Sequence, residues 1–195
     1  AHASLYYPTG IMGRELVHWL DHSIESGRVR GGSALIYGPA GAFAFENSRS
    51  GMFQVLFDTE DVRLAYRPGW PPLTQVDAHV RFEGNHVDIH TRSAQIYDSQ
   101  VERLHARIGS LEPIAPLEVE GRLRGPLRDN LRVLQEEALA DRFGNFAAAL
   151  AGSGRTTLDL DFRIPLKRRD DNYALKGRLA FGGNGVHRKA LIGLL

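Results

Sequence analysis

The sequence predicts a mainly β protein, an antiparallel meander of nine or ten strands with two or three short helices. Most of the chain alternates apolar and polar residues with a period of two, which is typical of strands with one buried and one solvated face. Short turn sequences separate the alternating runs. The regular alternation of strands with helices that a parallel sheet requires is not visible.

A short helix is expected at residues 11–27, directly after a Pro-Thr-Gly turn signal. Gly27 is a plausible C-cap for it, because helices commonly end with a glycine just beyond the last turn. Four apolar residues of this segment recur at helical spacing: Leu16, Trp19, Leu20 and Ile24.

From Arg28 the period changes to two, and an antiparallel sheet is expected over residues 28–124. Strands are predicted in the runs SALIYG, AFAFE, MFQVLFD and DVRLAYR, on both sides of a tight turn at Gly84-Asn85, and in VERLHARIG and LEVEGRLRG. The segment RPGWPPL carries three prolines, so it predicts an irregular corner between two strands.

A helical insertion is expected over residues 128–151, where apolar residues again recur every three or four positions. A β-hairpin over residues 156–182 is expected to close the unit. Its first strand, in TTLDLDFRIPL, alternates strictly between apolar and charged residues, and NYALKGRLAF repeats that pattern.

The bulk composition excludes several classes of function. The chain has 195 residues, 43% of them hydrophobic, so it can bury a sizeable core. A formal net charge of +1 argues against a nucleic-acid partner, and the absence of cysteine removes disulfide and thiolate chemistry. No apolar run is long enough to span a membrane as a helix. The first residue is not Met and the last residues are apolar with no closing turn, so residues 1–195 are expected to be a single fragment of a longer chain.

The sequence predicts no catalytic residue and no cofactor. Ser99, Ser110 and Ser153 are predicted in loops, and none lies in the strand–turn–helix elbow that exposes a nucleophilic serine. The glycine-rich stretches GPAG and GGNG are not followed by the lysine and helix of a phosphate-binding loop.

A metal site is also not expected. The best candidate is His86-x-Asp88-x-His90, whose three side chains share one face of a strand. At about 3.3 Å per residue, the α-carbons of His86 and His90 lie about 13 Å apart, too far for both imidazoles to reach one ion comfortably. His79 on the neighbouring strand could complete a site with only two of these residues. Solvated polar side chains are the simpler interpretation, although an enzyme using His79, His86 and Asp88 stays a minor alternative.

The apolar face of the sheet is therefore the feature that needs an explanation. Each buried Leu, Ile, Val or Phe contributes roughly 1.5–3 kcal/mol, so a strand with four of them cannot leave that face in water. Two short helices are too small to cover ten strands. Either the sheet folds on itself as a closed β-sandwich or barrel, or an apolar ligand covers the face.

The order of several motifs resembles one known family. The run IMGRELVHWLDHSIESGRVRGGSALIYGPAGAFAFENSRSGMFQVLFD, the corner LAYRPGWPPLTQVDAHVRFEGNHVDI, the helix entry VEGRLRGPLRDNLRVLQ and the strand LDLDFRIPL are similar, in this order, to the AsmA-like proteins of Gram-negative envelopes, and among them to the YhdP type. The resemblance covers about residues 11–182.

This resemblance implies a sheet curled into an apolar trough, as in bridge-like lipid transfer proteins. Such proteins are periplasmic and anchored in the inner membrane by an N-terminal helix that is missing here. Phospholipid acyl chains are thought to slide along the trough between the inner and outer membranes while the headgroups stay in water. The present chain would contribute one section of that conduit, with no enzymatic activity; the alternative is a non-catalytic scaffold or partner-binding module of an envelope protein.

Alternation and resemblance together predict which residues line the groove. They are the apolar members of the alternating runs: Phe53, Val55, Val80, Phe82, Leu104, Ile108, Val119, Leu123, Leu158, Leu160, Phe162, Ile164, Leu175 and Leu179.

Overall fold

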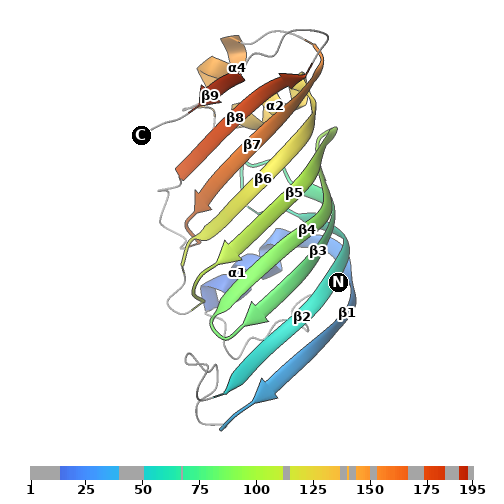
Figure 1. The fold of residues 1–195 in the computed structure, drawn as a ribbon, viewed down its shortest axis with the longest axis vertical. Helices are drawn as coiled ribbons and strands as arrows, with labels where there is room; N and C mark the ends of the chain where they lie inside the picture. Colours follow the sequence, from blue (N-terminus) through green and yellow to red (C-terminus); the bar gives the residue numbers. More distant parts are fainter. Residues whose placement is uncertain are drawn as a thin grey trace.

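The computed structural model describes residues 14–39, 51–66, 68–111, 115–136, 140, 144–149, 153–166, 174–182 and 189–192. These residues form one antiparallel sheet of nine strands in which every strand pairs with its neighbours in sequence (Figure 1). The predicted meander is confirmed. The strands are β1 (Ile24–Tyr37), β2 (Met52–Leu64), β3 (Leu73–Glu83), β4 (His86–Ile96), β5 (Ser99–Ile108), β6 (Leu117–Pro126), β7 (Arg155–Ile164), β8 (Ala174–Gly182) and β9 (Lys189–Ile192).

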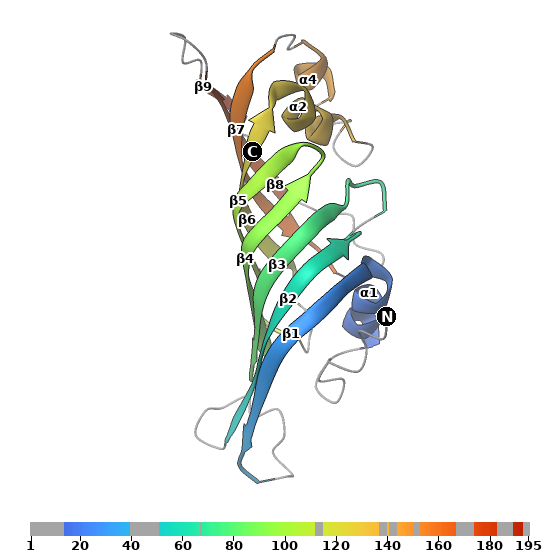
Figure 2. The ribbon, with the colours of Figure 1, turned by 90° about the vertical axis from the view of Figure 1, so that its right-hand side faces the viewer.

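The sheet is curled but open, with β1 at one edge and β9 at the other. Among the described residues, three short helices lie on its concave side (Figure 2): α1 (Arg14–Ser23), α2 (Leu127–Gln135) and α4 (Asn145–Ala149). The alternative of a closed sandwich or barrel is wrong, because within the described part of the chain the two edge strands pair only with β2 and β8.

The register places apolar residues in rows that run across the strands on the concave face. One row pairs Phe57 with Val80, Val80 with Ile89 and Ile89 with Ala106, and continues through Val119 to Phe162 and Leu175. Since side chains alternate between the two faces, the neighbouring positions form polar rows on the convex face. The period of two in the sequence therefore reflects the two faces of this sheet, one apolar and one polar.

The end of the first helix differs from the prediction. The first helix ends at Ser23, not at Gly27, because the Ser23 carbonyl accepts a hydrogen bond from Ala65 N–H at 2.7 Å and the chain continues as β1. Gly27 lies inside β1, with φ +135°, at the irregularity of the β1–β2 register between Ser26 and Arg28. It is a glycine because an added Cβ would lie 2.5 Å from Val62 Cγ2.

The runs MFQVLFD and DVRLAYR, expected as two strands, form the single strand β2. A bulge at Asp61, whose φ is +51°, offsets the two halves of β2, and this broke the alternation in the sequence. The predicted strand AFAFE lies outside the described residues. At the other end of the sheet, the hairpin of β7 and β8 is not the last element, since β9 adds a ninth strand to β8.

A small cluster of buried polar residues holds α2 against the sheet through hydrogen bonds. Asn130 of α2 accepts a hydrogen bond from Ser99 Oγ of β5 at 3.0 Å, and its amide donates to Thr156 Oγ1 of β7 at 2.7 Å. All three residues are buried. Gly125, just before α2, allows this close approach, because an added Cβ would lie 2.1 Å from Ser99 Oγ. Ser99 was predicted in a loop, but it is the first residue of β5 and its hydroxyl is engaged in this cluster.

Candidate functional site: an apolar groove

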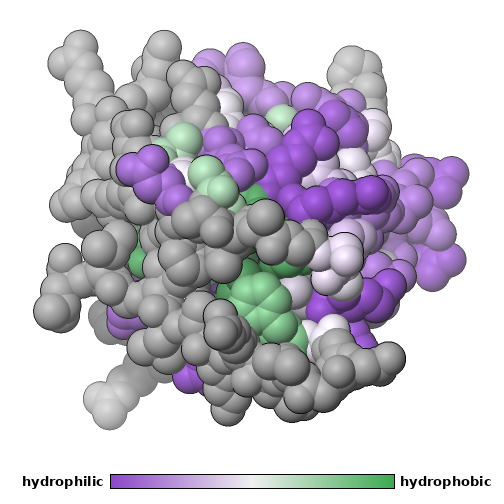
Figure 3. Space-filling model, turned by 90° about the horizontal axis from the view of Figure 1, so that it is seen from above, coloured by the Kyte–Doolittle hydropathy of each residue, from purple (hydrophilic) through white to green (hydrophobic). Residues whose placement is uncertain are grey.

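The concave side of the sheet holds a cavity of about 300 Å³. Strands β1 to β7 form its walls, and residues of α1, of the β2–β3 connection and of α2 close it partially from the other side. Arg28 is the one charged residue among the described side chains that line it. Seen from above, apolar side chains are visible in the centre of the molecule, while hydrophilic residues gather toward one side (Figure 3).

The β2–β3 connection, residues 65–72 with 67 outside the description, crosses the concave face, and we call it the crossing segment. Trp19 of α1 donates its indole N–H to the Tyr66 carbonyl at 2.9 Å, which ties the helix to this segment. The buried Trp70 packs edge-on against Phe162 of β7, with ring centroids 5.1 Å apart, and against Tyr66 at 5.8 Å. These aromatic contacts join strands that lie far apart in the sheet order.

The Tyr66 phenol belongs to the same partly closed region. Burial raises the pKa of Tyr66 above its usual range, with smaller contributions from Tyr97 and Glu136. Tyr97 forms the β4–β5 turn with φ +52°, hydrogen-bonds to Glu136 and lies under the guanidinium of Arg132, 4.0 Å from the ring centroid. Burial, followed by this hydrogen bond, raises the pKa of Tyr97 to about 12. The crossing segment, the β4–β5 turn and the end of α2 thus meet on one side of the cavity.

Nine of the fourteen residues predicted to line the groove do line the cavity. They come from four strands and lie on the concave face: Val80, Phe82, Leu104, Ile108, Val119, Leu123, Leu160, Phe162 and Ile164.

The other five share the concave face but lie beyond the cavity. Leu158 and Leu179 are fully buried and pair with each other across β7 and β8, near the start of α2, so they belong to a closed core. Leu175, also buried, pairs with Phe162. Phe53 and Val55 lie on β2 toward the β3–β4 turn, where the Phe53 carbonyl accepts a hydrogen bond from Gly84 N–H. The groove is therefore open in the middle of the sheet and filled by its own side chains near α2.

The residues that cover the cavity were not predicted from the sequence. These are Trp19 and Leu20 of α1, Tyr66 and Trp70 of the crossing segment, and Val133 of α2. One signal could have found Trp70: a large aromatic residue in a proline-rich corner has to be buried against something. The partner, Phe162, could not be inferred because it depends on how far the sheet curls.

The described lining is mostly apolar; apart from the two indoles, its polar side chains are Arg28 and the hydroxyls of Ser26, Thr59, Thr91 and Tyr66. No aspartate, glutamate or histidine contributes to it. Ser110, one of the predicted loop serines, is a hydrogen-bond acceptor for the Asn85 amide at 3.1 Å. Ser153 is exposed and outside the lining.

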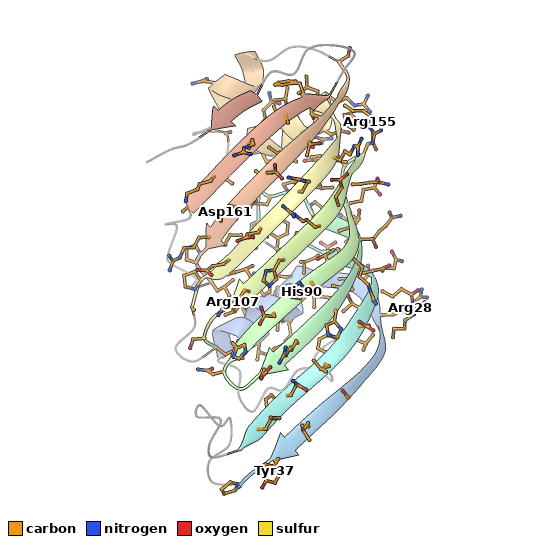
Figure 4. All side chains as sticks on the ribbon, viewed as in Figure 1. Arg28, Tyr37, His90, Arg107, Arg155 and Asp161 are labelled. Atoms are coloured by element: carbon orange, nitrogen blue, oxygen red, sulfur yellow. The ribbon has the colours of Figure 1, made fainter. Side chains whose placement is uncertain are left out.

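The convex face is polar and crossed by ion pairs between strands. Arg122 of β6 binds Asp159 of β7 through two hydrogen bonds of 2.6 and 3.2 Å, and this pairing raises the pKa of the Arg122 guanidinium. Figure 4 shows His90, Arg107 and Asp161 on this outward face. Each exposed ion pair of this kind contributes at most about 1 kcal/mol to the free energy of folding. Their main effect is that the convex face is hydrated while the concave face is apolar.

No helix in the described ranges combines the length and the apolar character needed to cross a membrane. The chain is 24% identical over 186 residues to the intermembrane phospholipid transporter YhdP of Escherichia coli (strain K12). That match covers 95% of this chain and 14% of the relative's length. No solved structure matches the chain significantly. The model of one family, the YhdP protein family, matches residues 1–192. The chain therefore belongs to the YhdP family, in agreement with the resemblance seen in its motifs.

Proposed function

We propose that this chain is one section of a lipid-transfer conduit in the Gram-negative envelope, carrying phospholipid between the inner and outer membranes. The observation that carries the proposal is the cavity on the concave face, walled by seven strands with Arg28 as its one described charged residue. An acyl chain placed there gains about 0.8 kcal/mol for each buried CH₂ group. The name of the E. coli relative, an intermembrane phospholipid transporter, supports the same class of ligand.

The shape of the lining suits a chain that slides. Its apolar rows run across the strands, and each row is followed by a similar one, so a methylene group that moves exchanges one set of contacts for an equivalent set. A headgroup would stay at the open side, in water, because the described lining offers it one charged partner, Arg28, and otherwise only a few hydroxyl groups. In this proposal the chain has no enzymatic activity and no cofactor.

The place of the section within the whole protein is part of the proposal. Since the chain spans 14% of the relative's length, it would not bridge two membranes alone. We propose a periplasmic location, with the longer protein anchored in the inner membrane by a helix outside this chain. Residues 1–195 would then be a single fragment of the longer conduit, in which neighbouring sections continue the groove.

A second candidate is a scaffold whose concave face is fully covered. The observation that favours it is the closure over β7 and β8, where Leu158 and Leu179 are fully buried, together with the cover that Trp70 provides. In this case the cavity is a packing defect, and the section serves to hold the protein's shape or to bind another envelope protein.

Site-specific photocrosslinking in cells separates the two candidates. A photoreactive amino acid replaces Val119, which lines the cavity, or its neighbour Glu120, which points to the convex face, in the full-length protein. The conduit predicts phospholipid adducts at Val119 and none at Glu120, detected by mass spectrometry of the crosslinked peptide. Equal labelling at both positions, or no lipid at Val119 in a folded protein, would favour the scaffold.

A further inference from the structure

The convex face carries a row of ionisable side chains that the groove does not use. Register places one residue from each strand from β2 to β8 in this outer row. Three of its central members are histidines on adjacent strands, and carboxylates lie on both sides of them. The members, in strand order, are Asp58, His79, His90, His105, Glu120, Asp161 and Lys176.

Two of these histidines and one carboxylate converge at the middle of the sheet. His90 of β4 and His105 of β5 are directly opposite, and their rings stack with centroids 4.3 Å apart and planes 6° apart. Asp88, two residues before His90 on the same face, approaches His105 Nε2 with its Oδ1 at 3.1 Å. The ligand atoms of all three side chains lie within 4.8 Å of one another.

This arrangement is close to what a tetrahedral ion requires. With metal–ligand bonds of about 2.0–2.2 Å, two ligands of one ion lie roughly 3.3–3.6 Å apart. The Asp88–His105 pair, at 3.1 Å, is already near this separation. His90 is exposed, so its ring can rotate the remaining distance without disturbing the core.

We propose that Asp88, His90 and His105 form a binding site for a divalent transition metal ion of the Zn²⁺ type, joining β4 to β5 on the outer wall of the groove. Two imidazoles favour Zn²⁺, Cu²⁺ or Ni²⁺ over Ca²⁺ and Mg²⁺, which prefer all-oxygen sites. Register places Arg81 and Arg107 on either side of Asp88, and these charges further disfavour cations held by electrostatics alone. Three protein ligands leave a fourth position for water or for another ligand.

The site departs from the sequence-based expectation of no metal. His86 and His90 are four residues apart on one strand, which is too far for both to bind the same ion. The sequence did not indicate that His105 is a third candidate ligand, because only the β4–β5 register places it opposite His90. His79, on the other side of His90, instead contacts Asp58 at 3.0 Å and is not one of the three ligands.

Titration of the full-length protein with ZnCl₂, followed by calorimetry, tests the site. Wild type is compared with the single variants His90→Ala and His105→Ala and with the matched control His86→Ala, which changes the same residue type on the same strand and face. The expected result is one tight equivalent fewer in the two site variants than in wild type and in the control. Loss of a direct ligand should weaken that binding by more than about tenfold, since even outer partners of a metal site account for 10–100-fold.

A second readout and a second control keep the result specific. Co²⁺ in place of Zn²⁺ should give the visible absorption of a four-coordinate ion in wild type and in His86→Ala, and lose it in His90→Ala. The His18 and His22 rings on α1, with centroids 4.0 Å apart, are another histidine pair, and the double variant His18→Ala/His22→Ala should retain the full stoichiometry. The proposal is overturned if the His90 and His105 variants bind as wild type does, or if the equivalent is lost with His18 and His22. Circular dichroism without metal checks that each variant is folded.

Discussion

Trp70, just before β3, packs edge-on against Phe162 of β7, with ring centroids 5.1 Å apart. In sheet order β3 and β7 are four steps apart, which in a flat sheet would separate them by about 19 Å. The contact exists because the sheet curls, and it holds the curl in place. The crossing segment therefore connects the two sides of the groove without adding a strand.

Replacing Trp70 by alanine should destabilise the protein strongly. The indole is buried between Tyr66 and Phe162, and truncation of a buried Trp costs about 3–5 kcal/mol. Trp70→Phe should recover a substantial part of this loss, because a ring still reaches Phe162. Urea unfolding measures the difference, and Tyr37→Ala is the control, since Tyr37 is 74% exposed and its loss should change the free energy of unfolding by less than about 0.5 kcal/mol. Equal effects at positions 70 and 37 would show that the crossing segment does not hold the sheet.

Gly121→Leu should block the groove without unfolding the protein. Gly121 lines the cavity, and an added Cβ there would meet nothing nearer than the Arg103 carbonyl oxygen at 3.8 Å. The leucine side chain should therefore occupy the space in which an acyl chain is proposed to move, with stability unchanged or raised.

Lipid crosslinking at Val119 is the readout for this variant, and it should fall by at least half. Gly31→Leu is the matched control, because Gly31 pairs with Asp58 of the convex face and an added Cβ meets no atom within 4 Å. Undiminished crosslinking in a folded Gly121→Leu protein would argue that lipid, if bound, does not pass this point.

Gly27→Ala should destabilise the edge of the sheet. The φ of +135° is unfavourable for alanine, and its Cβ would lie 2.5 Å from Val62 Cγ2 and 2.8 Å from Val62 Cα. We expect a loss of more than about 1 kcal/mol, since glycine positions of this kind do not accept a side chain without backbone movement. Gly31→Ala on the same strand should be neutral. Thermal unfolding compares the two variants, and similar midpoints would contradict a strained bulge at Gly27.

Asp77 should make the free energy of unfolding depend on pH in the acid range. Its carboxylate accepts the Asp61 backbone N–H at 2.9 Å, and this hydrogen bond, helped by Ser93, Arg92 and Arg30, lowers the pKa of Asp77. Because the folded pKa lies below the unfolded value of about 3.9, this contribution is complete above that value and is lost as pH falls through the folded pKa.

The stability difference between wild type and Asp77→Ala measures this effect. It should be constant between pH 7 and about pH 5 and shrink as the pH falls below about 3.9. Chemical unfolding at several pH values gives this difference directly. A difference that does not change with pH would mean that the charge of Asp77 has no part in holding the bulge at Asp61.

The sequence predicted the sheet well because its signals are local. The alternation around Phe162 and the Gly84-Asn85 turn depend only on neighbouring residues, and both appear in the structure as expected. The bulge at Asp61 was read as a strand boundary, because one extra residue shifts the alternation as a turn would. The end of α1 was placed too late because Ile24 fits the helical spacing and the cavity lining equally well.

The candidate site was predictable only in part. Alternation indicates which face a residue such as Leu158 occupies, but not whether a helix covers it there. Five of the expected residues lie beyond the cavity: Leu158 and Leu179 belong to the closed core near α2, Leu175 is buried opposite Phe162, and Phe53 and Val55 lie toward the β3–β4 turn. The cover formed by Trp19 and Trp70, and the meeting of His90 with His105, both depend on how strands distant in sequence are brought together, which no local pattern records.

The order of the strands also determines at which stage of folding the two sides of the groove can come into contact. Every strand pairs with the one synthesised just before it, so the ladders can form one after another as the chain emerges, without waiting for distant segments. Trp70 is the exception, because its partner on β7 comes much later in the chain. Trp19 and Trp70 are the two tryptophans of the sequence, but Trp19 bonds to Tyr66 in the early part of the chain, whereas Trp70 contacts β7. The part of the fluorescence change that comes from Trp70 packing on Phe162 should therefore follow a late step of folding, after the first six strands have assembled.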